Sequence, residues 1–167
     1  MILALVIVAS LNPNRANFGI VFGAEVGKSS PGSLVRVLGK GVGEVRHFKL
    51  KGEIVRDDGW DWWDWRAGNA NVQSYWSPAF PISKRRIERI TICERFGKGP
   101  SIAPSTKLSG WLAGLKIGMP KEQCLDKMVA LFGSPHREFG QYVWASKTHY
   151  MYVSCDPLLS EIVIISR

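Results

Sequence analysis

The sequence predicts an α+β protein of two tandem units, each a short helical segment packed on an antiparallel sheet. A helix-like run followed by three strand-like runs fills the C-terminal part of the chain, and the N-terminal part repeats this order. A stretch rich in glycine, proline and serine separates the two parts. We therefore expect a first unit over residues 1–96, a linker over 97–110 and a second unit over 111–167.

The second unit has the clearer pattern. Apolar residues recur every three or four positions between Pro120, which suits a first helical turn, and Gly133, which suits a helix end. Three runs rich in aromatic and β-branched residues follow, and such runs are typical of strands. They are Tyr142-Val143-Trp144, Tyr150-Met151-Tyr152-Val153 and Ile162-Val163-Ile164-Ile165.

The first unit shows the same order more faintly. A helix is expected to end just before Gly39, as the other ends just before Gly133, and the apolar run 20–23 takes the place of 115–118. Two copies of one unit are implied. The runs that match the last two strands of the second unit are 75–76 and 87–92.

The glycines around the second helix carry a family resemblance. Gly118-Met119 before the helix and Gly133-Ser134-Pro135 after it resemble the repeat shared by beta-lactamase inhibitor proteins and the small lipoprotein of outer-membrane assembly. The resemblance implies short helices on one face of a curved antiparallel sheet whose other face binds a partner protein. The chain lacks the paired cysteines of the secreted inhibitors, and residues 50–74 form an insert outside the repeat. The inhibitor's target therefore does not carry over.

Composition indicates a basic globular protein. The 22 Lys+Arg and 14 Asp+Glu residues give a net charge of +8, and no apolar run approaches the roughly 18 residues of a membrane-spanning helix. An odd number of cysteines, at 93, 124 and 155, favours a reducing, cytoplasmic compartment. Residues 1–10 are apolar without a basic start, so we expect a buried strand. As a signal remnant they would instead indicate a periplasmic or secreted protein.

The sequence offers no recognised catalytic, cofactor-binding or metal-binding motif. His47, His136 and His149 lie far apart, and none has an Asp, Cys or Ser at a motif offset. The run 23–29 has three residues between its glycines, where a phosphate-binding loop needs four. We therefore expect a protein that is not an enzyme and that needs no cofactor or metal.

Aromatic and basic side chains are the candidates for contact with a protein partner. Four tryptophans lie between Trp60 and Trp65, and in an extended segment they alternate between two faces. Either one pair contacts a partner or all four pack in the core. The basic run 84–86 is expected at an exposed hairpin tip. The candidate partner-binding residues are Trp62, Trp63, Trp76, Arg85, Arg86, Trp144, Tyr150 and Tyr152.

The favoured function is a protein-binding module, an inhibitor or immunity-type protein that neutralises a bacterial toxin or enzyme. The main alternative is a basic nucleic-acid-binding protein, which the charge and the stacking-capable aromatics favour. Against it, Asp61 and Asp64 lie among the tryptophans and would repel phosphates. An enzyme acting on a polysaccharide is the third interpretation, because tryptophan faces beside carboxylates suit sugars.

Overall fold

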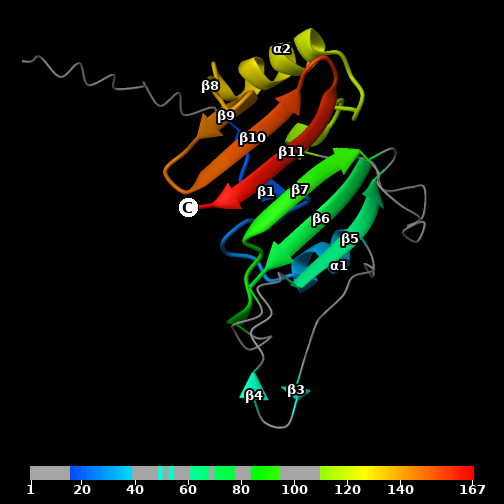
Figure 1. Cartoon of the computed structure of the whole chain (residues 1–167), viewed down its shortest axis with the longest axis vertical. Coiled ribbons are helices and arrows are strands. Elements are labelled where there is room, and N and C mark those ends of the chain that lie inside the picture. The colour runs from blue at the N-terminus through cyan, green and yellow to red at the C-terminus, as the bar shows by residue number, and fades with distance from the viewer. Residues whose placement is uncertain are drawn as a thin grey trace, which may run out of the picture.

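The chain folds around a seven-stranded antiparallel sheet with helices on one of its faces (Figure 1). The α+β class and the antiparallel sheet are therefore confirmed. The structure is a computed structural model; it describes backbone and side chains of residues 16–38, 70–77, 84–94 and 110–167, and the backbone alone of 49–50, 53–54 and 61–67. Residues 1–10, Gly39, the linker up to residue 109 and the side chains of Trp62 and Trp63 lie outside this description.

The first part of the chain forms a small hairpin, a helix, a second small hairpin and three strands of the main sheet. Helix α1 lies where the apolar run before Gly39 predicted it. The elements are β1 (Ile20–Val21), β2 (Ala24–Glu25), α1 (Gly32–Leu38), β3 (Lys49–Leu50), β4 (Glu53–Ile54), β5 (Asp61–Ala67), β6 (Ala70–Trp76) and β7 (Arg89–Glu94).

The second part forms a helix followed by four strands. Pro120 is the N-cap of α2, and Gly133 ends it with a φ of 79° and an N–H that donates to the Val129 carbonyl at 2.8 Å. The expectation of three strands is wrong, because β8 was missed: its three residues are all exposed and carry no apolar alternation. The elements are η2 (Gly110–Leu112), α2 (Lys121–Phe132), β8 (His136–Glu138), β9 (Gln141–Ala145), β10 (His149–Cys155) and β11 (Leu159–Ser166).

The strand order of the main sheet is β5-β6-β7-β11-β10-β9-β8. Strands β7 and β11 meet in the middle, where Ile92 lies opposite Ile162 and Ile90 opposite Ile164. The two parts of the chain therefore share one continuous sheet. Strand β5 comes from the segment expected to be an insert, and it pairs with β6 along seven residues.

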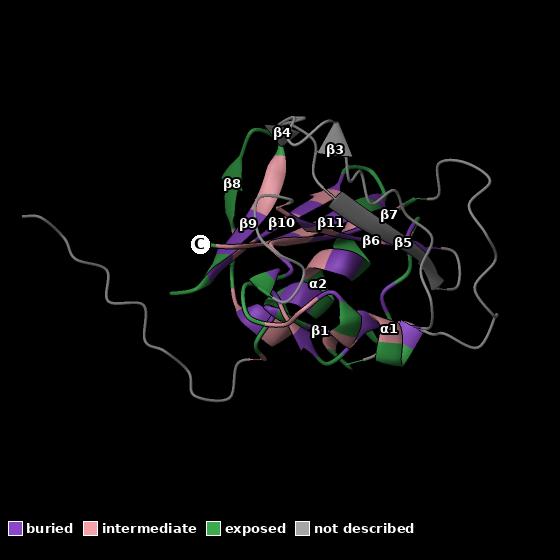
Figure 2. Cartoon of the chain, turned by 90° about the horizontal axis from the view of Figure 1, so that it is seen from below, coloured by how far each residue is buried: buried purple, intermediate pink, exposed green. Residues whose placement is uncertain are grey.

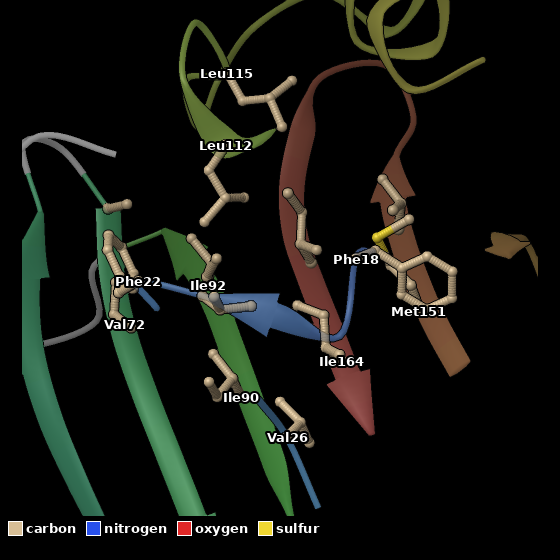
Figure 3. Close-up of a cluster of buried hydrophobic side chains, with 14 of the residues drawn as sticks. Phe18, Phe22, Val26, Val72, Ile90, Ile92, Leu112, Leu115, Met151 and Ile164 are labelled. Atoms are coloured by element: carbon tan, nitrogen blue, oxygen red, sulfur yellow. The ribbon is translucent and has the colours of Figure 1, made fainter. Parts of the chain in front are cut away.

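The core lies between the sheet and the helices. Figure 2 shows α1, α2 and β1 on the same side of the sheet. Most buried side chains of the sheet point to this side, where Phe22 and Val26 from the β1–β2 region and Leu112 from η2 pack over Ile90 and Ile92 (Figure 3). Asn71, Thr91 and Val143 are also buried but lie on the opposite face of the sheet. The helices add their own buried residues, which are Leu34, Leu38, Cys124, Met128 and Phe132.

Backbone hydrogen bonds tie the segment before each helix to the start of a central strand, at Ile87 just before β7 and at Leu159 in β11. The Gly27 N–H donates to the Ile87 carbonyl at 2.6 Å, and the Ile87 N–H donates to Ser29 at 2.9 Å. Before α2, the Gly118 N–H donates to the Leu159 carbonyl at 2.7 Å, and the Leu159 N–H donates to Met119 at 2.8 Å. These bonds fix the segments that lead into both helices against the sheet, although the return bond reaches two residues beyond Gly27 and one residue beyond Gly118.

Candidate binding surface

The face of the sheet opposite the helices is the candidate binding surface. Side chains alternate along a strand, so burial of Met151 and Val153 in the core directs Tyr150 and Tyr152 to the other side. The register then places the side chains of the neighbouring strands on this side as well. We call the half-buried set Tyr75, Arg89, Tyr150, Tyr152, Val163 and Ile165 the open face.

Tyrosine rings and guanidinium groups are stacked on the open face. The Arg89 guanidinium lies 3.8 Å from the centre of the Tyr75 ring, and Arg167 lies 4.3 Å from that of Tyr150 and donates a hydrogen bond to its hydroxyl. The rings of Tyr150 and Tyr152 are 6.2 Å apart. Each stack contributes about 0.5–1 kcal/mol at an exposed site and holds its ring in place. The open face therefore presents orientated aromatic surface beside positive charge.

Isoleucine and valine fill the middle of the open face. Ile165 lies between Arg89 and Tyr150 in one cross-strand row, and Val163 lies opposite Tyr152 in the next. Polar side chains border these rows and are hydrogen-bonded to one another. The Tyr75 hydroxyl donates to Gln73 at 2.6 Å, and Gln141 donates to the Ser154 hydroxyl at 2.9 Å. An apolar centre with a polar rim is the usual composition of a protein interface.

Tyr150 and Tyr152 lie where they were expected, but two of the predicted tryptophans do not. Trp76 is 2% exposed and Trp144 is 4% exposed, so the expectation that they point outward is wrong. Trp144 lies opposite the buried Met151, and its Nε1 donates to the Gly133 carbonyl at 2.6 Å. Its ring therefore covers the end of α2. Alternation predicts two faces for each strand, but it does not say which face meets the helices.

The predicted basic rim is reduced to one arginine. Arg85 is 6% exposed, which contradicts its expected place at an exposed tip, and the fully buried Ile87 follows it. Arg86 is exposed, and its Nη1 donates to the Arg85 carbonyl at 2.9 Å. The backbones of Trp62 and Trp63 lie opposite Tyr75 and Ser74 in the β5–β6 pair.

Sequence reasoning missed most of the open face. Tyr75 was placed on a strand without a binding role, and Arg89, Val163, Ile165 and Arg167 were not selected. Their contacts form across three strands, β6, β7 and β11, whose register a single sequence does not specify. The only available signal was the alternation of polar and apolar residues from Arg89 to Cys93.

The described residues provide no evident catalytic group. His149 is 1% exposed, and because a carbonyl only accepts, its Nε2 donates to the Val26 carbonyl at 2.8 Å, while its Nδ1 lies 2.8 Å from the Thr148 hydroxyl. Burial raises the pKa of the Cys124 thiol to about 12 and also raises the pKa of Cys155, so neither is poised as a thiolate. No group of three or more His, Cys, Asp or Glu within the described ranges could hold a metal ion.

No family model, curated protein or solved structure matches the chain. Within the described part of the chain, no helix is long and apolar enough to span a membrane.

Proposed function

We propose that the chain is a non-catalytic protein-binding module that uses the open face to hold its partner. The observation that carries the proposal is the pair of Tyr–Arg stacks, Tyr75 with Arg89 and Tyr150 with Arg167, on the side of the sheet opposite the helices. Tyrosine and arginine are among the residues that dominate protein interfaces. A net charge of +8 favours an acidic partner surface and speeds encounter with it.

We propose that the module consists of two tandem α+β units. Backbone hydrogen bonds support this when the first unit is aligned with the second in a different register from the one expected from the sequence. The hydrogen bond from Gly27 to Ile87 has the place of the bond from Gly118 to Leu159, so Gly27, and not Gly23, is the counterpart of Gly118. The expected match of run 20–23 with 115–118 was four residues out of step.

In the corrected register, residues 19–27 align with residues 110–118 without a gap. All three glycines of one segment then fall on glycines of the other. Gly23 and Gly114 have φ values of 75° and 81°, and Gly27 and Gly118 have φ values of 84° and 85°. Since only glycine adopts such values without strain, both segments need glycine for the same backbone reason. This agreement supports duplication of one unit.

The narrower function is that of an inhibitor or immunity-type protein that neutralises a bacterial toxin or enzyme. Its support is the resemblance of Gly118-Met119 and Gly133-Ser134-Pro135 to the repeat of the inhibitor proteins. A sheet with one face packed on helices and half-buried aromatic side chains on the other fits that role, because blocking a target needs a rigid surface and no chemistry of its own.

The test is affinity capture from the native host, followed by a dissociation constant for the purified pair. Tyr152→Ala is expected to weaken binding at least about 30-fold if its ring is central to the interface. The control is Lys127→Ala on the exposed side of α2, which should change the constant less than about twofold. Retention of full affinity by Tyr152→Ala and by Tyr150→Ala would refute the open face as the binding surface.

A further inference from the structure

The tip of the β8–β9 hairpin presents a phenylalanine in a backbone conformation that this residue seldom adopts. Glu138 pairs with Gln141, so the loop consists of Phe139 and Gly140 alone. Their φ values are 46° and 83°. Two positive φ values in a two-residue loop define a type I′ turn, for which Asn-Gly is the favoured sequence. Phenylalanine at the first position therefore holds backbone strain that asparagine would largely avoid.

The β1–β2 hairpin contains the same turn with the same two residues. Val21 pairs with Ala24, and Phe22 and Gly23 have φ values of 50° and 75°. Phe22 is 6% exposed and packs in the core beside Val72 (Figure 3), so burial of its ring offsets the strain. Phe139 is 97% exposed. The same strain is present at both turns, but at the β8–β9 tip the whole ring faces solvent.

A second exposed apolar residue lies at the same end of the sheet. Leu158, in the turn between β10 and β11, is 48% exposed. The two turns are joined by Arg137, whose Nη2 lies 3.3 Å from the Asp156 carboxylate, and Lys121 Nζ lies 3.7 Å from the same carboxylate. Phe139 and Leu158 are thus two exposed apolar residues at one end of the sheet, and we call this end the hairpin tip.

Among the side chains that the structure describes, charges around the hairpin tip are close to balanced. Asp156 faces Arg137 and Lys121, and Glu138 lies 3.6 Å from the ring of His136. An anionic membrane surface is bound by clusters of four or more uncompensated basic residues, which this arrangement does not provide. The hairpin tip, with apolar residues beside balanced charges, is instead complementary to an apolar pocket of a protein that is rimmed by polar groups.

We propose that Phe139 is the anchor of the interaction, inserting its ring into an apolar pocket of the protein partner while Leu158 packs at the pocket's edge. The inference rests on the proposed function and adds to it a second contact region, outside the open face. The turn fixes the backbone that carries the ring before binding, so insertion costs the rotamer freedom of one side chain and little backbone entropy. The strain that Phe139 holds in the free chain is offset only in the complex, as that of Phe22 is offset in the core.

The decisive variant is Phe139→Asn, which keeps the turn and removes the ring. It is expected to raise the melting temperature by about 1–4 °C, because asparagine suits the positive φ. Affinity for the purified partner is expected to fall at least about 30-fold. The matched control, Phe22→Asn, makes the same replacement in the same turn and is expected to lower the melting temperature instead, since it removes a buried ring.

The partner contact is tested directly with a photoreactive benzophenone side chain at position 139. Cross-linking in host cells is expected from position 139 and not from position 37, an exposed apolar site on α1. Absence of a protein cross-link from position 139 would overturn the inference. So would binding of the chain to vesicles of 30% phosphatidylglycerol in phosphatidylcholine that depends on Phe139, because a membrane would then be the occupant.

The dissociation constants separate this inference from the proposed function. If Tyr152→Ala weakens binding and Phe139→Asn leaves the constant within threefold of wild type, the anchor is refuted and the open face stands. If Phe139→Asn weakens binding and the tyrosine variants do not, the open face is refuted and the hairpin tip stands.

Discussion

Replacing Gly19 with alanine should destabilise the fold strongly, although the substitution adds only one methyl group. A Cβ at Gly19 would lie 2.3 Å from Cε1 and 2.4 Å from Nδ1 of His149, far inside van der Waals contact. The imidazole cannot move away freely, because it is 1% exposed and hydrogen-bonded to the Val26 carbonyl at 2.8 Å. Val26 is itself fixed, since its N–H donates to the Gly19 carbonyl at 2.9 Å.

The expected loss has two parts. Forcing extra volume into a packed site costs about 1–3 kcal/mol. Displacing the ring far enough to break its bond with Val26 leaves buried polar groups unsatisfied, at about 1–3 kcal/mol. Gly19→Ala should therefore lower the free energy of unfolding by about 2–6 kcal/mol, a large part of the 5–15 kcal/mol typical of a folded protein. Urea unfolding at 25 °C, followed by tryptophan fluorescence, measures it.

Two further alanine substitutions serve as controls. Gly32→Ala, at the start of α1, would place its Cβ 3.8 Å from the nearest side-chain atom, and should leave stability unchanged or raise it by up to about 1 kcal/mol. Gly23→Ala has open space but a φ of 75°, so it should cost about 1–2 kcal/mol. In a His149→Ala background, Gly19→Ala should cost less than about 1 kcal/mol, because the ring is gone. The reasoning fails if the free energy of unfolding of Gly19→Ala is within about 1 kcal/mol of the wild-type value. It also fails if Gly19→Ala destabilises the His149→Ala variant as much as it destabilises the wild type.

Three other outcomes follow from the structure. The Cys124 thiol, with its pKa raised by burial from 9.0 to about 12, stays neutral in the folded chain while the unfolded chain ionises above about pH 9. Stability should therefore fall as pH rises from 9 to 12, by up to about 1.4 kcal/mol per pH unit, and urea midpoints of Cys124→Ala should lack this part of the decline. Trp144→Phe loses the bond to the Gly133 carbonyl and should cost about 1–3 kcal/mol in the same assay; a loss below 0.5 kcal/mol would argue against that bond. Binding to duplex DNA, measured by fluorescence anisotropy, should be non-specific and weaken steeply between about 50 and 200 mM salt, whereas sequence-selective binding at 200 mM would favour the nucleic-acid alternative.

Prediction from sequence succeeded where the signal is local. Helix α2 was predicted because its apolar period, Pro120 and Gly133 all lie within one short stretch. Strand β8 was missed because an exposed three-residue edge strand has no apolar alternation to detect. The proposed duplication takes a different register from the one that the apolar runs suggest, because those runs allow shifts that the glycine positions and the bonds of Gly27 do not favour.

The binding surface was the least predictable part. Trp76 and Trp144 were chosen because large aromatics often dominate interfaces, yet large aromatics also fill cores, and only the packing of helices on one face decides between the two. The stack of Arg89 on Tyr75 depends on the pairing of β6 with β7, which no local pattern encodes. Phe139 stands beside a glycine in a polar stretch, and its exposure depends on what lies next to the turn, because Phe22 is buried in a turn of the same conformation.

The central position of β11 has a consequence for how the chain reaches its native state. This strand comes last along the chain but lies between β7 and β10. Until it is added, β5-β6-β7 and β10-β9-β8 are two separate groups of strands without a common hydrogen-bonded partner. During synthesis, the edge of β7 must remain unpaired until residues 159–166 leave the ribosome, and closing that long separation in sequence is slow. A chain shortened before Leu159 would therefore lack β11, which joins the two groups of strands. The edges of β7 and β10 that pair with β11 would then be exposed and prone to aggregation.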